Sequence, residues 1–144
     1  METILKGCIT EIKCKLYFLE LGYVVSVPGK PVRYDFVLDT GNQLLRVQVK
    51  SSKVTNGVMV LATNSTHLKN GKWTHQTYGP DEVDFICTWV NEVCYLIPIS
   101  ECTGLKEKRL RFKPAKNGQI KRISLAKDYV AKDVLERLKH DGDR

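Results

Sequence analysis

A carboxylate, an amide and an amine occur in an order that suits phosphodiester hydrolysis. Twelve residues separate Asp35 from the run Gln48-Val49-Lys50. Asp35 offers a carboxylate, Gln48 a side-chain carbonyl and Val49 a backbone carbonyl, and hard cations such as Mg²⁺ prefer oxygen ligands of these kinds. Lys50 could orient a nucleophilic water or stabilise developing negative charge. As a bare pattern this is weak, so the elements that carry it must be considered.

The stretch 33–53 predicts a β-hairpin that brings these residues together. Its two runs are rich in β-branched and aromatic residues with alternating polarity, and Gly41-Asn42 is a favoured two-residue turn. With that turn Asp35 lies opposite Gln48, and Lys50 lies diagonally from Asp35 on the same face. The other face is apolar and carries Tyr34, Phe36, Leu38, Leu45, Val47 and Val49. A sheet with one solvated face would explain the same alternation without any chemistry.

A helix precedes the hairpin and several strands follow it. Helical periodicity predicts a helix over 3–21, ended by Gly22, with an apolar stripe expected to face the sheet. The stripe consists of Leu5, Cys8, Ile9, Ile12, Leu16 and Leu19. Apolar runs predict strands at 23–27, 58–63, 83–90 and 93–97.

The C-terminal half is less regular. Residues 64–80 are polar and predict a loop. A short strand is expected at 110–113, and Ser124 is expected to cap a final helix over 125–139. The tail after His140 is expected to fray.

Bulk composition predicts one soluble intracellular domain. The chain has 144 residues, 42% hydrophobic and 27% charged. No apolar run approaches the roughly 18 residues that cross a bilayer, and the N-terminus lacks a signal-peptide pattern, which predicts a cytoplasmic protein without a membrane partner. Five cysteines without a Cys-x-x-Cys pair, and histidines without ligand spacing, argue against a disulfide framework and a zinc site.

The net charge of +7 is concentrated in one segment. Residues 106–122 hold eight basic residues against Glu107, while the rest of the chain is balanced. Such clustering favours contact with a polyanion, and nucleic acid is the expected one. A solvated basic loop is the simpler alternative.

Further motifs surround the hairpin residues. In chain order they are Glu11 in the first helix, Leu21-Gly22-Tyr23-Val24-Val25, Pro28, Tyr34-Asp35-Phe36-Val37, Val47-Gln48-Val49-Lys50-Ser51-Ser52, Val83-Asp84-Phe85 and Tyr95-Leu96-Ile97-Pro98. Over roughly residues 1–100 this set resembles the PD-(D/E)XK nuclease superfamily. Within it, the sequence looks most like the branch of bacterial group I intron-encoded homing endonucleases and, more distantly, like archaeal Holliday-junction resolvases.

The resemblance implies an α/β fold with a restriction-endonuclease-like core, in which an N-terminal and a C-terminal helix flank a mixed central β-sheet. Residues 1–100 would form the nuclease core, with 101–144 packed on the same single domain. Asp35 would bind the metal, Lys50 would be the catalytic lysine, and Glu11 would lie near the metal. Gln48 stands where most members have Asp or Glu, so metal affinity should fall unless Glu11 contributes. Tyr34 replaces a proline that is common in the superfamily.

The implied function is a Mg²⁺-dependent endonuclease that hydrolyses double-stranded DNA at a specific site in the manner of a homing enzyme, with Mn²⁺ as a substitute ion. Cutting two strands needs two sites, so a homodimer or homotetramer is expected. The residues expected to contact DNA are Lys53, Lys69, Lys72, Arg109, Arg111, Lys113, Lys116, Lys121 and Arg122.

Three alternatives remain open at this point. A junction-resolving nuclease would use the same site on branched DNA. A catalytically inactive nuclease fold that only binds DNA is compatible with the missing acidic residue at Gln48. An RNA-binding protein is the weakest of the three.

Overall fold

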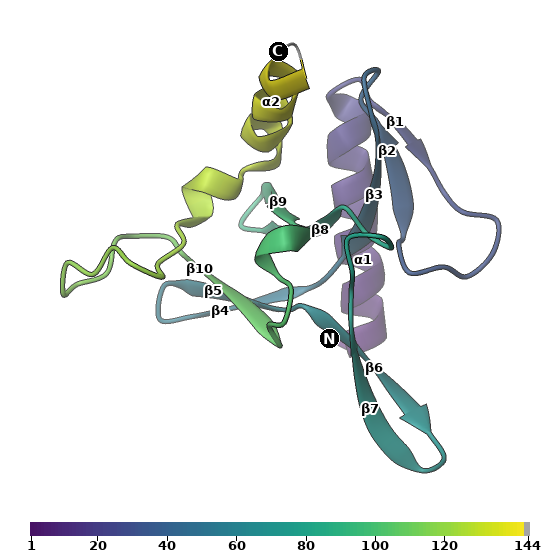
Figure 1. Ribbon diagram of the computed structural model, residues 1–144, viewed down its shortest axis with the longest axis horizontal. Helices are drawn as coiled ribbons and strands as arrows, with labels where there is room; N and C mark the ends of the chain where they lie inside the picture. The colour runs from purple at the N-terminus through teal and green to yellow at the C-terminus, as the bar shows by residue number, and fades with distance from the viewer. Residues whose placement is uncertain (143–144) are drawn as a thin grey trace.

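The computed structural model describes residues 1–142 as two sheets, a projecting ribbon and two principal helices (Figure 1). The elements, in chain order, are α1 (Thr3–Glu20), β1 (Val24–Ser26), β2 (Phe36–Asp39), β3 (Leu44–Val49), β4 (Ser52–Thr55), β5 (Val58–Ala62), β6 (Asn64–Lys69), β7 (Lys72–Thr77), β8 (Phe85–Val90), β9 (Val93–Pro98), η1 (Ile99–Glu101), β10 (Glu107–Arg111), η2 (Ala126–Tyr129) and α2 (Ala131–Gly142). No helix in this part of the chain is both long and apolar enough to cross a membrane.

The central sheet is mixed, as the family resemblance implied. Its five strands are ordered β1-β2-β3-β8-β9, and all pair antiparallel except β3 with β8. A smaller antiparallel sheet is ordered β10-β5-β4, and β6 pairs with β7 alone. Residues of both helices pack with the central strands in one apolar cluster, and the small sheet contributes to a second cluster.

The predicted hairpin register is confirmed. Phe36 pairs with Val47 and Asp39 pairs with Leu44, while the Thr40 N–H donates to the Gln43 carbonyl across the turn at 3.0 Å. The turn needs a positive φ, which Gly41 supplies at +88°. The side chains predicted for the apolar face are buried from Phe36 to Val49. Tyr34 is the exception: it lies ahead of the first paired residue, so the alternation does not extend to it, and it packs against the second cluster.

The predicted orientation of the first helix was wrong. Its inner face is lined by Thr10, Cys14 and Phe18, which are buried. The stripe expected to face the sheet is directed outward instead, and Ile12 and Leu19 are 60% and 53% exposed. The helix is apolar on two sides, and it is the side with Cys14 and Phe18 that packs in the cluster with the central strands.

Three further predictions were wrong after residue 63. Residues 64–77 form the β6–β7 ribbon rather than a loop. Ser124 does not cap a helix, because this segment is extended: its carbonyl accepts from the Arg111 N–H at 2.8 Å. Helix α2 therefore begins only at Ala131, after η2, and the strand expected at 110–113 lies at 107–111. Of the tail expected to fray, the structure has helix through Gly142, and residues 143–144 lie outside the described part.

Candidate functional site

Glu11 of α1 and Asp35, just before β2, bring two carboxyl groups together beside the hairpin. The Val49 N–H donates to Oδ2 of Asp35 at 2.7 Å, and the Asp35 N–H donates to the Val47 carbonyl at 2.9 Å. These bonds fix the Asp35 side chain against β3. Glu11 reaches it from α1 and also pairs with Lys15 at 3.5 Å, and its side chain is 33% exposed.

The electrostatics of Asp35 reflect this crowding. Its pKa is raised from 3.8 to about 6, chiefly by burial and further by the neighbouring Glu11, while the hydrogen bond from Val49 and the charge of Lys50 act in the opposite direction. Two carboxylates this close repel each other unless a proton or a cation lies between them. The pair is therefore a place where a divalent cation would be stabilised.

Gln48 and Val49 lie on β3 beside Asp35 and carry neutral oxygen atoms of the kind that bind a hard cation. Gln48 lies on β3 opposite Ile86 of β8, and its amide nitrogen is 3.4 Å from the Val49 carbonyl oxygen. A half-turn of the amide would exchange its NH₂ for its carbonyl oxygen. Two carboxylates, an amide oxygen and a backbone carbonyl fit a hard cation such as Mg²⁺ or Mn²⁺ and do not fit a soft one.

Lys50 continues β3 on the same side as Gln48. Its backbone N–H donates to the Cys87 carbonyl at 2.9 Å, and its ammonium donates to the Asn64 carbonyl at 3.0 Å. The ammonium also lies 5.2 Å from the centre of the Tyr78 ring. A neutral carbonyl and an aromatic face thus position the lysine charge, which acts on Asp35 as a nearby cation.

Arg33 connects this site to the ribbon and was missed in the sequence. Its guanidinium donates to Glu82 at 3.0 Å, to the Ser65 hydroxyl at 2.8 Å and to the Thr77 carbonyl at 2.9 Å. It also lies 4.2 Å from the centre of the Tyr78 ring. Because Ser65 and Thr77 belong to β6 and β7, Arg33 holds the base of the ribbon beside Lys50. The sequence does contain a partial signal for the ribbon, because Asn70-Gly71 between its two strands is a favoured hairpin turn.

The residues predicted to contact DNA fall in three places. Lys69 and Lys72 pair with each other at the tip of the ribbon. Lys53 and Arg109 both pair with Val60 of β5, on its two sides, so they share one face of the small sheet with Arg111. We call Lys53, Arg109 and Arg111 the basic sheet face. The remainder follow β10 in the segment that precedes η2: Lys113, Lys116, Lys121 and Arg122.

Part of the basic segment is already paired within the chain. Arg109 is 2.8 Å from Glu107, although both side chains are largely exposed. Lys108, on the opposite face of β10, is 3.8 Å from Glu101 and only 13% exposed. The segment therefore offers fewer available cations than its sequence indicates.

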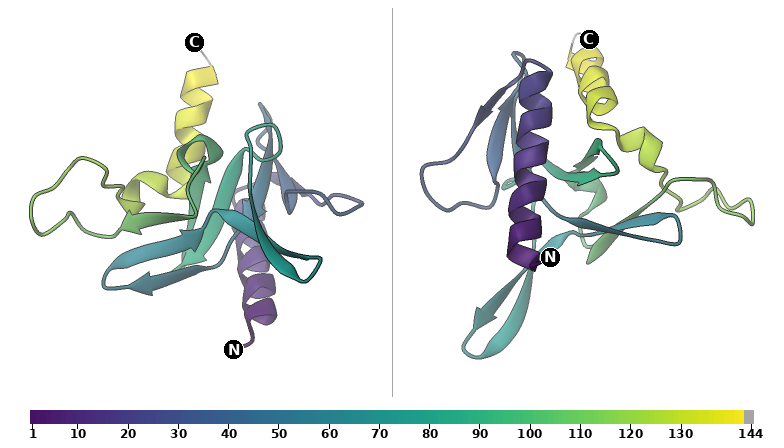
Figure 2. Two further views of the ribbon diagram at one scale, coloured as in Figure 1. Left: turned by 60° about the horizontal axis from the view of Figure 1, so that its bottom comes forward. Right: turned by 180° about the vertical axis from the view of Figure 1, so that it is seen from behind.

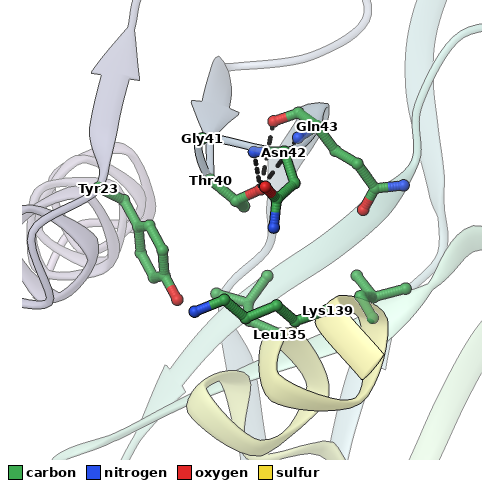
Figure 3. Close-up of a pocket in the computed structure, with 8 residues that line it drawn as sticks. Tyr23, Thr40, Gly41, Asn42, Gln43, Leu135 and Lys139 are labelled. Atoms are coloured by element: carbon green, nitrogen blue, oxygen red, sulfur yellow. Dashed lines mark hydrogen bonds between the residues drawn. The ribbon is translucent and has the colours of Figure 1, made fainter. Parts of the chain in front are cut away.

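A pocket of about 540 Å³ lies at the turn end of the hairpin (Figure 3). Tyr23, Asn42 and Lys139 are among its lining residues, and the Tyr23 hydroxyl and the Lys139 amine point toward one another. Asp35 and Gln48 are at the other end of the same hairpin, so this pocket is separate from the carboxylate site.

Three cysteine sulfurs gather in the first cluster. The sulfurs of Cys14, Cys87 and Cys94 lie within 4.8 Å of one another, and all three side chains are buried. The group has three members and a closed structural zinc site has four ligands. These thiols come from α1, β8 and β9, so sequence spacing could not reveal their proximity.

Comparisons with known proteins identify the family of the chain. A sequence model of the PD-(D/E)XK endonuclease family matches residues 1–132. A solved structure of a bacterial homing endonuclease, I-Ssp6803I, is similar with a TM-score of 0.76 and 26% sequence identity, over 98% of this chain and 97% of that chain. A search of curated proteins finds no significant match. Because the family model covers most of the sequence, the chain belongs to the PD-(D/E)XK endonuclease family.

Proposed function

We propose that the protein is a metal-dependent endonuclease that cuts double-stranded DNA at a specific site. The observation that carries this proposal is the meeting of Glu11 and Asp35 beside Lys50. Family membership supports nuclease chemistry, and similarity to a bacterial homing endonuclease supports a site-specific DNA target.

The proposed metal ligands are Asp35, Glu11, the Gln48 side-chain oxygen and the Val49 carbonyl oxygen, with Mg²⁺ as the ion and Mn²⁺ as a substitute. Such an ion, when bound, lowers the pKa of a water and offsets phosphoryl charge. The protein's own part is to hold its acidic groups in place, through the Val49 N–H, and to present the Lys50 ammonium. We assign Lys50 to orienting the attacking water or stabilising the negative oxygens of the scissile phosphate.

Glu11 bears on the interpretation of the fold as an inactive DNA-binding module. Gln48 contributes no charge, which leaves Asp35 as the sole carboxylate of the hairpin motif at this site. The carboxylate of Glu11 supplies a second negative charge from α1, beside Asp35. A site with two carboxylates can retain a divalent cation, so the amide at position 48 does not argue for loss of activity.

We propose that DNA contacts three basic surfaces: the ribbon tip, the basic sheet face and the segment after β10. Arg33 anchors the base of the ribbon next to Lys50, while Lys69 and Lys72 lie about 17 Å further along it at the rise of a strand, so a duplex that contacts both would extend from the site along the ribbon. A duplex has two strands to cut, so we further propose that the working form contains at least two copies, as a homodimer or homotetramer.

The experiment that tests the proposal is cleavage of a mixed DNA pool by the wild type, Asp35→Asn and Lys50→Ala, with Mg²⁺ and with EDTA. We expect discrete products from the wild type with Mg²⁺ only, and sequencing of their ends would give the target. A four-way junction tested beside linear duplex separates a junction-resolving enzyme from a site-specific one. Products that persist in EDTA or in Lys50→Ala would contradict the proposed site.

A further inference from the structure

Helix α1 has an outer apolar face that no described element of the chain covers. The inner face, with Thr10, Cys14 and Phe18, is buried against the sheet. In the right-hand view of Figure 2, α1 stands in front of the sheet with its outer side open. The outer face holds apolar side chains that are half or more exposed: Ile4 at 73%, Leu5 at 50%, Ile12 at 60%, Leu16 at 51% and Leu19 at 53%.

The spacing of these side chains is that of a helix-pairing seam. Leu5, Ile12 and Leu19 are seven residues apart from one to the next. Cys8 lies three residues after Leu5, and Leu16 lies four residues after Ile12. Residue 15, three residues after Ile12, is a lysine, so the stripe is a broad amphipathic face rather than a strict coiled-coil seam, and such a face packs against another helix. From Leu5 to Leu19 it is about 21 Å long at the helical rise. Single exposed leucines are ordinary, whereas a continuous exposed stripe marks an interaction surface. We call Leu5, Cys8, Ile12, Leu16 and Leu19 the α1 seam.

Charges beside the α1 seam indicate what binds it. Lys6, Lys13 and Glu20 follow one another along one edge, at seven-residue intervals. In a two-fold pair of antiparallel helices, each edge faces the same edge of the other copy in reverse order. Lys6 of one copy then lies opposite Glu20 of the second copy, twice in the pair. A parallel two-fold pair would instead place this edge against the opposite edge of the second copy, where Glu11 and Lys15 are paired with each other, so Lys6 and Glu20 would not meet.

The central lysine does not oppose this arrangement. Lys13 would be closest to the two-fold axis, but its ammonium is directed back to its own domain, 5.9 Å from the centre of the Trp89 ring. On the other edge Lys15 is paired with Glu11 of the same helix at 3.5 Å, so that edge presents no net charge. The charge pattern is therefore self-complementary in the antiparallel sense.

We propose that the α1 seam binds the α1 seam of a second copy of this chain, with the two helices antiparallel. Specific interfaces cover about 800 Å² on each partner. The residues directly after the helix add exposed apolar area, with Leu21 at 38% and Val24 at 57% exposed. The inference deepens the oligomeric part of the proposed function by naming its surface. It is measured without DNA or metal, so its failure leaves the proposed chemistry untouched.

The first test is sedimentation of the full chain over a concentration series. We expect the wild type to associate, and Ile12→Glu with Leu16→Glu to raise the dissociation constant at least about 100-fold, because two charges would be buried in each half of the interface. Ile120→Glu is the matched control, since Ile120 is 85% exposed in another part of the molecule. A monomeric wild type, or a double variant that associates as well as the control, would overturn the proposal.

The second test addresses the antiparallel arrangement. Lys6→Glu should weaken association about tenfold, because it places like charges together at two symmetric positions. Glu20→Lys alone should weaken it similarly, and the combined variant should recover the wild-type dissociation constant. All three leave the α1 seam intact, so folding is not at issue. A combined variant weaker than either single variant would exclude this pairing.

Discussion

Glu11 and Asp35 come from different elements, a helix and the strand end beneath it, yet their carboxyl groups interact directly. Neither position is explained by stability, because burial and mutual repulsion both penalise the ionised pair. The arrangement is the reverse of what a core requires, and it is the one that a cation site requires. Its energetic cost gives measurable consequences.

Asp35→Asn should stabilise the metal-free protein at neutral pH. The folded pKa of Asp35, about 6, lies above its ordinary 3.8, so the stability due to its proton is fully present below pH 3.8 and is lost as pH rises through 6. Asparagine carries no charge and can still accept from Val49. Allowing for screening by solvent, we expect a gain on the order of 1 kcal/mol at pH 7.5. Thermal unfolding of both proteins in EDTA measures this gain, and the difference in stability between the variant and the wild type should vanish near pH 4.

Metal affinity should depend on pH with a break near 6. A ligand carboxyl must lose its proton, so the dissociation constant for Mg²⁺ should rise about tenfold for each unit below that break and be flat above it. Glu11→Gln removes a charge that raises the pKa of Asp35, so the break should move to lower pH. The variant also loses a proposed ligand, so its affinity for Mg²⁺ above the break should be weaker than that of the wild type. Calorimetric titration at several pH values follows both. An unmoved break in the variant would show that Glu11 does not act on Asp35.

The hairpin and its register could be predicted because local rules decide them. The turn dipeptide sets the pairing, and the alternation of Phe36 to Val49 leaves one arrangement in which both apolar faces coincide. The same two rules are enough to predict that Asp35 and Gln48 lie together. Glu11 came from family resemblance, since no local rule relates a helix residue to a distant strand.

The orientation of α1 could not be predicted from its periodicity. Periodicity finds an apolar face but does not say what covers it, and here the stronger stripe, with Ile12 and Leu16, is directed outward. The inner face uses Thr10 and Cys14, whose small side chains contribute little to a hydrophobic pattern. The ribbon was missed for a related reason: β7 is exposed along its length, so no buried face imposes alternation on it.

Gln48→Glu should strengthen metal binding. Affinity of hard cations follows the charge of the ligand set, so a third carboxylate should lower the dissociation constant for Mg²⁺ about tenfold and raise cleavage at limiting Mg²⁺. Gln48→Ala removes the oxygen altogether and is the matched control, with weaker binding than the wild type. Equal affinities for the two variants would mean that residue 48 does not contact the ion.

Lys53 and Arg109 should both contribute to DNA binding through the basic sheet face. They flank Val60 on the same side of the small sheet, so one stretch of backbone phosphates can meet both. If six to eight phosphates are contacted in all, the log-log salt slope of binding should be about −5 to −7, and alanine at either position should reduce its magnitude by about 1. Binding is measured in EDTA, so that no cleavage intervenes. Lys127→Ala is the control, since that exposed lysine lies on η2 and outside the three basic surfaces.

Glu107 provides the opposite test of the same surface. Its carboxylate is 2.8 Å from Arg109, so a phosphate must displace it before it can pair with the guanidinium. Glu107→Gln should therefore tighten DNA binding severalfold at low salt, and the gain should shrink as salt screens the original pair. In an Arg109→Ala background the same change should have little effect, because the competition has been removed. A gain that persists without Arg109 would assign the effect to net charge alone and would exclude a direct phosphate contact by this arginine.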